Sequence, residues 1–126
     1  ERIVFAGKIA HEKIGWAYAV AKVFAFPSMT DTQSLTLHEA ALAGLPIVMV
    51  DEPVTEVVKD GENGYFANND PIDMAAKIRR ILEDPGLQKH MSAVSRKTAG
   101  HFTEKRQAKL ILDIYADILK KREAIL

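Results

Sequence analysis

Residues 23–51 read VFAFPSMTDTQSLTLHEAALAGLPIVMVD, and this stretch decides the fold. It opens with an apolar run at 23–26 and closes with another at 47–50. Short apolar runs without alternation are typical of strands in a parallel sheet that is covered on both faces. Between them, residues 34–43 predict a helix, and Gly44 follows at the position where helices commonly end. The stretch therefore predicts a strand, a helix and a second strand.

The same pattern continues outward on both sides. Upstream, residues 2–6 predict a strand that ends at Gly7, and residues 12–21 predict a helix of high alanine content. Strand, helix, strand, helix, strand is a βαβαβ unit, which implies a parallel sheet with right-handed crossovers. Downstream, the expected elements are a short helix at 55–59, a short strand at 65–67, and helices at 72–82, 87–99 and 103–122. The predicted fold is a Rossmann-like α/β domain over residues 1–126, a parallel sheet flanked by helices, with 103–122 as its C-terminal helix.

The composition is that of an ordinary globular domain, and it narrows the classes of function. The 126 residues indicate one domain, and 17 basic and 17 acidic residues give a net charge of zero, which argues against a nucleic-acid partner. Because the sequence has no cysteine, disulfides and thiolate metal sites are excluded and a cytoplasmic location is expected. No apolar run reaches the roughly 20 residues that span a bilayer. Since the chain opens directly on an apolar strand, we expect it to be a fragment of a longer protein.

The candidate site lies between the two central strands. In an open parallel sheet, ligands bind beyond the carboxyl ends of the strands, here 7–8, 27–33 and 51–53. The middle loop leads directly into a helix, whose first N–H groups and dipole favour an anion such as a phosphate. Asp31 lies just before this helix and Glu39 lies inside it, so two carboxylates flank the anion site and can accept hydrogen bonds from hydroxyls. A diphosphate with a sugar at each end fits this arrangement.

These residues resemble a known family. Asp31 and Glu39 have seven residues between them, which resembles the Glu-x7-Glu signature of the group 1, or family 4, retaining glycosyltransferases of the GT-B architecture. Further landmarks follow in the family's order: Phe5-Ala6-Gly7, Pro27-Ser28, Gly44-Leu45-Pro46, Glu56 and Asp60-Gly61-Glu62-Asn63-Gly64. The resemblance covers about residues 1–82. It implies the C-terminal, donor-binding half of a GT-B enzyme, truncated at its N-terminus and lacking the N-terminal acceptor domain.

The resemblance implies a role for each matching position. Glu39 would accept hydrogen bonds from the ribose hydroxyls of a nucleotide, and Asp31 would contact hydroxyls of the transferred sugar; these two form the implied catalytic pair. The residues implied to bind the donor are Gly7, Lys8, Thr32, Gln33, Ser34, Leu35, Thr36 and Glu39. Among them, the backbone amides of 32–36 would hold the sugar and the diphosphate, and Gly7 and Lys8 would lie near the base.

For the whole enzyme, the resemblance implies glycosyl transfer from a nucleotide diphosphate sugar with retention of anomeric configuration. It implies no cofactor and no metal, because helix-end amides and basic side chains would stabilise the leaving diphosphate. The isolated chain is expected to be inactive. Residues 30–33, Thr-Asp-Thr-Gln, are close to the Thr-Glu-Thr-Gln of bacterial glycolipid glucosyltransferases, which points to a lipid acceptor, with a polysaccharide as the other choice. A lipid acceptor would bring the full protein to the inner face of a membrane as a peripheral protein.

Two positions depart from the family pattern. Asp31 stands where the family usually has Glu, and its side chain is shorter by one methylene, about 1.5 Å. Either the transferred sugar lies deeper in the site, or its contact with Asp31 is weaker than the contact that Glu makes in the family. Ser34 stands where Gly is common, so its side chain would crowd the sugar.

Simpler interpretations of the same residues stay open. Asp31 or Thr32 could be a helix N-cap, and Thr36 with Glu39 could form a capping box if the helix starts later. Lys8 could be an ordinary solvated lysine. The apolar stripe at 108–119 of the last helix favours self-association, so a homodimer is one expected partner state.

Two other functions also stay open. The chain could be a nucleotide-binding module without catalysis. It could also be a phospho-accepting receiver, since Asp51 follows an apolar strand, although Gly7-Lys8 is not the acidic pair that receivers need. A metal site is not expected, because His11-Glu12 and His38-Glu39 each begin like a zinc-protease helix but lack the second His.

Overall fold

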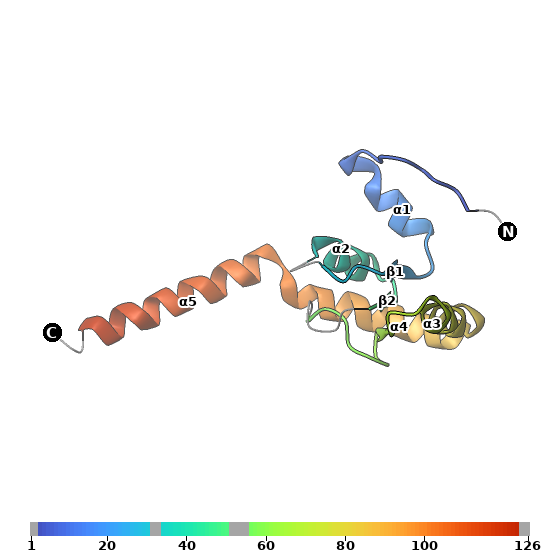
Figure 1. Ribbon diagram of the computed structural model, residues 1–126. Helices are drawn as coiled ribbons and strands as arrows, with labels where there is room; N and C mark the ends of the chain where they lie inside the picture. The colour runs from blue at the N-terminus through green and yellow to red at the C-terminus, as the bar shows by residue number, and fades with distance from the viewer. Residues whose placement is uncertain (1–2, 31–33, 51–55, 124–126) are drawn as a thin grey trace.

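The structure is a computed structural model and describes residues 3–30, 34–50 and 56–123. Its centre is a small sheet of three parallel strands, β1 (Phe24–Phe26), β2 (Ile47–Met49) and β3 (Gly64–Phe66), in the order β1-β2-β3. Figure 1 shows helices packed on both sides of the strands. The predicted fold class, a parallel sheet flanked by helices, is confirmed.

The helix α2 (Leu35–Ala43) connects β1 to β2, as predicted. Ser34 precedes it in an extended conformation, and Gly44 follows it with a φ of 84°. This left-handed conformation suits glycine, and it directs the Gly44 N–H to the carbonyls of Ala40 and Ala41. Glycine therefore ends α2 at the point where the chain turns into β2.

Two further helices confirm the predictions at 72–82 and 87–99. They are α3 (Pro71–Glu83) and α4 (Pro85–Ala99). Each has proline in its first turn, where a missing N–H costs nothing. Each also follows an aspartate whose carboxylate accepts backbone hydrogen bonds from the first turn, Asp70 for α3 and Asp84 for α4.

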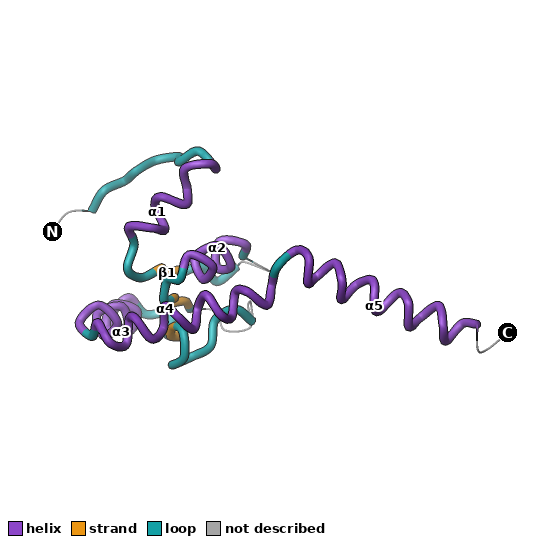
Figure 2. The backbone as a smooth tube through the Cα atoms, turned by 180° about the vertical axis from the view of Figure 1, so that it is seen from behind, coloured by secondary structure: helices purple, strands orange, loops and turns teal. Residues whose placement is uncertain are grey.

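The last helix, α5 (Glu104–Glu123), follows a short 3₁₀ turn at Gly100–Phe102 and lies where the sequence predicts it. Figures 1 and 2 show α5 projecting from the body of the molecule, with the C-terminus at its far end. Its large apolar side chains are accordingly exposed: Leu110, Ile111, Leu112, Ile114, Tyr115, Ile118 and Leu119.

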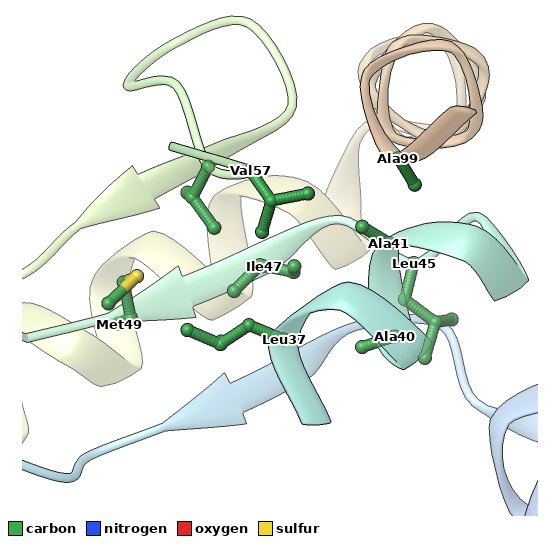
Figure 3. Packing of buried hydrophobic residues seen from close by; sticks show 9 residues of the cluster. Leu37, Ala40, Ala41, Leu45, Ile47, Met49, Val57 and Ala99 are labelled. Carbon is green, nitrogen blue, oxygen red and sulfur yellow. The ribbon is translucent and has the colours of Figure 1, made fainter. Parts of the chain in front are cut away.

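Two clusters of buried side chains pack on opposite faces of the sheet. The first lies on the side of α2 and contains Leu37, Ala40, Ala41, Leu45, Ile47, Met49, Val57, Val58 and Ala99 (Figure 3). The second lies on the side of α3 and α4 and contains Val48, Tyr65, Ala67, Ile81 and Met91. Along β2, Ile47 and Met49 belong to the first cluster and Val48 to the second, as the alternation of a strand requires. Burial on both faces explains why β2 is continuously apolar.

A buried asparagine shapes the loop before β3. The Asn63 side chain accepts a hydrogen bond from the Lys59 N–H at 2.7 Å and donates one to the Val57 carbonyl at 2.8 Å. These bonds hold the loop in a non-helical form. Residues 56–59, the described part of the helix predicted at 55–59, are not helical, so that prediction is wrong there. The strand predicted at 65–67 is present one residue earlier, as β3.

The strand predicted at 2–6 is wrong over its described part, residues 3–6. Residues 3–10 belong to no strand or helix, and Ile3, Val4 and Phe5 are 82%, 81% and 94% exposed. A strand is stabilised by its neighbours and by burial more than by its own backbone preference. No strand pairs with this run in the part of the chain that the structure describes, so its apolar residues alone do not make it a strand.

The helix predicted at 12–21 is present but shorter. It is divided into a 3₁₀ turn (His11–Lys13) and α1 (Ile14–Val20). Figure 1 shows α1 standing beside α2, with the N-terminal segment leading away from its upper end. Without the first strand, the predicted βαβαβ unit is reduced to β1, α2 and β2, followed by β3.

Candidate functional site

The amino end of α2 is the place where the sequence predicts the site. The chain leaves β1 at Phe26, passes through Pro27 and Ser28, and enters α2 at Leu35. The amino end of α2 therefore follows the carboxyl end of β1, the edge at which open parallel sheets bind ligands. Asp31, Thr32 and Gln33 lie outside the described residues.

A compact hydrogen-bonded turn precedes α2. Ser34 is only 5% exposed, and its Oγ lies 2.6 Å from Oγ1 of Thr36. The Ser34 carbonyl accepts from the Leu37 N–H at 3.2 Å and lies 3.2 Å from Nδ1 of His38. The Leu35 side chain, by contrast, is exposed. Two hydroxyls are thus held together at the first turn of the helix.

The structure decides against the capping box. The N-cap residue of α2 is Ser34, and Asp31 and Thr32, the other capping candidates, lie outside the described residues. Thr36 is the second residue of the helix, and the Glu39 carboxylate bonds to another helix, so the pair does not form a capping box.

Glu39 lies on the second turn of α2 and faces α1. Its side chain is half-buried, and its Oε2 accepts a hydrogen bond from the Tyr18 hydroxyl at 3.0 Å. Burial, the hydrogen bond to Glu39 and the negative charge of Glu39 together raise the pKa of Tyr18 to about 12. Tyr18 therefore remains a hydrogen-bond donor throughout the physiological pH range. Among the described residues, Oε1 of Glu39 has no hydrogen-bond partner.

Gly7 and Lys8 lie on a different part of the molecule. Gly7 has a φ of 67°, and no atom lies within 4 Å of the position that a Cβ would take there. Lys8 is exposed. Figures 1 and 2 both show this segment leaving the far end of α1 and lying apart from the sheet. The structure thus brings Ser34, Thr36 and Glu39 together on α2 but leaves Gly7 and Lys8 apart from them.

Tyr18 is the site residue that sequence reasoning missed. It lies in the alanine-rich helix α1, and its ring packs edge-on to Phe24 at a centroid distance of 5.9 Å. The contact with Glu39 joins residues 21 positions apart on two helices. No motif spacing reports such a contact, because it depends on how α1 docks on α2.

A cavity of about 400 Å³ lies at the opposite end of α2, away from the predicted site. Gly44, Pro46 and Arg96 line it, and Tyr18 forms part of its wall. Arg96 donates to the Ala43 carbonyl at 3.1 Å and so supports the carboxyl end of α2. The cavity therefore lies at the carboxyl end of α2, whereas the anion site is predicted at its amino end.

Two further observations concern the described residues alone. They contain no group of three or more His, Asp or Glu side chains placed to hold a metal ion. None of the helices in the described ranges combines the length and apolar character needed to cross a membrane. Asp51, the residue of the receiver alternative, lies outside those ranges.

Comparison with known proteins identifies the fold. The structure resembles that of a sucrose-phosphate synthase from Thermosynechococcus elongatus with a TM-score of 0.83 and 25% sequence identity, over 95% of this chain and 31% of that one. That match is to a GT-B glycosyltransferase domain, so the predicted GT-B resemblance is confirmed.

Proteins of similar sequence support the same assignment. The chain is 29% identical over 116 residues to an alpha-monoglucosyldiacylglycerol synthase of Acholeplasma laidlawii, over 91% of this chain and 29% of that protein. It is also 29% identical over 113 residues to a D-inositol 3-phosphate glycosyltransferase of a Nocardioides species, over 88% of this chain and 25% of that protein. The chain thus spans less than a third of the length of these relatives.

A family model settles the classification. The model for the glycosyl transferases group 1 family matches residues 1–84, which is most of the chain. This match also removes the receiver alternative, because the landmarks that it covers are those of a transferase domain. The chain belongs to the group 1 glycosyltransferase family.

Proposed function

We propose that this chain binds the donor in a glycosyltransferase that moves a glycosyl group from a nucleotide diphosphate sugar to an acceptor. The observation that carries the proposal is the position of Glu39. It lies on the second turn of α2, the helix that follows the parallel strand β1, in a chain of this family. The relatives are named as an alpha-monoglucosyldiacylglycerol synthase, a D-inositol 3-phosphate glycosyltransferase and a sucrose-phosphate synthase, and these names fit this reaction class.

In the proposed complex, the ribose and the diphosphate of the nucleotide are bound by different kinds of group. A carboxylate only accepts hydrogen bonds, so Glu39 binds ribose hydroxyls. The backbone N–H groups of Ser34, Leu35 and Thr36, with Thr32 and Gln33, bind the diphosphate at the positive end of α2. Asp31 accepts hydrogen bonds from the transferred sugar. Gly7 and Lys8 meet the base once the segment at 3–10 turns back toward β1.

The same groups assist the chemical step. The bond between the anomeric carbon and the diphosphate oxygen breaks, and a new bond to an acceptor oxygen forms, with that oxygen losing its proton. The negative charge that develops on the leaving diphosphate is stabilised by N–H dipoles already aimed at it, and such preorganised donors are a large source of rate enhancement. We propose that the reaction retains the anomeric configuration and uses no metal or cofactor.

The proposed acceptor and location rest on the names of relatives and on residues 30–33. The names of several relatives describe synthases of glycosylated diacylglycerols. Together with Thr-Asp-Thr-Gln at 30–33, this favours a lipid acceptor, and hence a cytoplasmic protein that associates peripherally with a membrane. The acceptor-binding half would be supplied by the rest of the protein, so the isolated chain should bind donor without turnover.

Calorimetric titration of this chain with UDP, GDP and ADP tests the proposal. One nucleotide should bind, and Glu39→Ala should lower its affinity by roughly 5- to 10-fold, the cost of a lost hydrogen bond of about 1 kcal/mol or slightly more. Glu83→Ala, an exposed carboxylate at the end of α3, is the matched control and should change nothing. If none of the three nucleotides binds, this chain is not a donor site.

A further inference from the structure

A side-chain hydrogen bond from Tyr18 links α1 to α2. α1 has no fully buried residue, and Trp16 and Val20 on it are 71% and 84% exposed. The Tyr18 ring is half-buried, packs against the first hydrophobic cluster and lies edge-on to Phe24. Phe24 in turn stacks on Phe26, with ring centroids 6.2 Å apart. Packing against Phe24 therefore restrains the Tyr18 ring.

This restrained ring presents its hydroxyl to Glu39. The distance from the Tyr18 hydroxyl to Oε2 is 3.0 Å, and Oε1 has no partner among the described residues. A glutamate side chain has three rotatable bonds, and ordering such a side chain carries an entropic cost. A donor fixed by packing limits the carboxylate to one arrangement before any ligand arrives, which lowers the cost of binding.

We propose that Tyr18 is a positioning residue of the donor site, which holds Oε2 of Glu39 so that Oε1 accepts a hydrogen bond from the ribose of the nucleotide. The proposal rests on the proposed function, since it gives Glu39 the same ligand. It adds a residue from α1, outside the segment that carries the two acidic residues. The proposal also predicts a preference for ribose over 2′-deoxyribose. A carboxylate oxygen that is fixed in place should accept a hydrogen bond from the 2′-hydroxyl, which deoxyribose lacks.

A purely structural role makes a different prediction. A half-buried tyrosine hydroxyl usually finds some partner, and Glu39 could serve only that purpose. In that case, removing the hydroxyl would affect stability but would not change how the site discriminates between nucleotides. Recognition of the ribose hydroxyl therefore separates the two roles.

The experiment is a double-mutant cycle read by calorimetry. Four proteins are titrated with UDP, GDP and ADP and with the 2′-deoxy form of each. They are the wild type, Tyr18→Phe, Glu39→Gln and the double variant. Tyr18→Phe keeps the ring and its packing, and circular dichroism confirms the fold of each variant. Tyr115→Phe, on the exposed surface of α5, is the matched control.

We expect Tyr18→Phe to weaken the ribonucleotide by about 3- to 10-fold and the 2′-deoxy form much less. In the Glu39→Gln background, the same substitution should have little further effect, since the carboxylate that Tyr18 positions is already absent. If Tyr18→Phe behaves like Tyr115→Phe while Glu39→Gln weakens binding, the positioning role is lost and the proposed function stands. Equal losses for both nucleotide forms also remove the positioning role. If the wild type binds none of the three nucleotides, the proposed function fails, and this inference fails with it.

Discussion

Gly64 lies so close to Ile47 in the neighbouring strand that a Cβ on Gly64 would collide with the Ile47 backbone carbonyl. The collision is with backbone, which cannot swing aside as a side chain can. The two residues are register partners of β3 and β2. Close approach of the two strands therefore accounts for glycine at this position of the Asp-Gly-Glu-Asn-Gly landmark.

Gly64→Ala should lower the free energy of unfolding by about 2 kcal/mol or more, since overpacking against fixed neighbours costs roughly 1–3 kcal/mol. Urea denaturation followed by circular dichroism measures it. Gly100→Ala is the control, because nothing lies within 4 Å of its added Cβ. Equal stability of the two variants would show that β3 can move away from β2 freely.

Asn63→Ala should also destabilise the fold, by about 2–4 kcal/mol. The side chain is fully buried, and its removal leaves the Lys59 N–H and the Val57 carbonyl each without its Asn63 partner, as well as a small void. Asn69→Ala, on the exposed turn before α3, should stay within about 0.5 kcal/mol of wild type. A loss for Asn63→Ala no larger than that of Asn69→Ala would contradict the role of the loop bonds.

The pKa of Tyr18 leads to a prediction in alkaline solution. Because the folded pKa is raised from 10.0 to about 12, the contribution of Tyr18 to stability is complete below pH 10 and is lost as the pH rises toward 12. The melting temperature of the wild type should therefore fall between these pH values more steeply than that of Tyr18→Phe. Glu39→Ala should lower the pKa of Tyr18, measured by tyrosinate absorbance, because it removes both the hydrogen bond to Glu39 and its negative charge, two of the three causes of the shift. An unchanged titration would mean that the pair is not bonded in solution.

Asp70→Ala should cost about 1 kcal/mol of stability, the usual cost of a lost N-cap. The Asp70 carboxylate accepts from the N–H groups of Ile72 and Asp73, both at 3.2 Å. Asp113→Ala, on the exposed face of α5, removes a carboxylate that caps nothing and should be close to neutral. Thermal unfolding of both variants makes the comparison, and Asp70→Asn should recover most of the loss.

The exposed apolar side chains of α5 predict self-association. Analytical ultracentrifugation of the chain should show a concentration-dependent dimer, since an apolar surface of this extent is unusual on a monomer. Ile111→Glu with Ile118→Glu should shift the population to monomer, and Gln107→Glu on the same helix should leave it unchanged. A monomer at all concentrations would mean that the apolar side chains of α5 do not mediate dimerisation of this chain.

The sequence predicted the parts of the fold that carry strong local signals. Gly44 marks a helix end through backbone chemistry, and α2 ends there; the helices predicted at 72–82 and 87–99 are present as α3 and α4. The apolar run at 47–50 predicted a strand covered on both faces, and β2 is buried on both. These features depend on neighbours in the chain, so they can be predicted from sequence.

The features that the sequence missed depend on distant contacts. Ile3, Val4 and Phe5 have the composition of a strand, yet pairing is not a local property, and they remain exposed. The loop at 56–59 is decided by the Asn63 side chain rather than by its own residues. For the site, Glu39 is placed on α2 as predicted, while its bond to Tyr18 arises only from the docking of α1. The donor-binding roles of these residues stay predictions.

The three residues of β2 divide their side chains between the two hydrophobic clusters, and this has a consequence for cooperativity. Neither cluster can lose its packing without displacing the strand on which the other depends. Heating should therefore melt both faces of the domain in one transition. A nucleotide held at the amino end of α2, on one face, should then delay hydrogen exchange in α3 on the other.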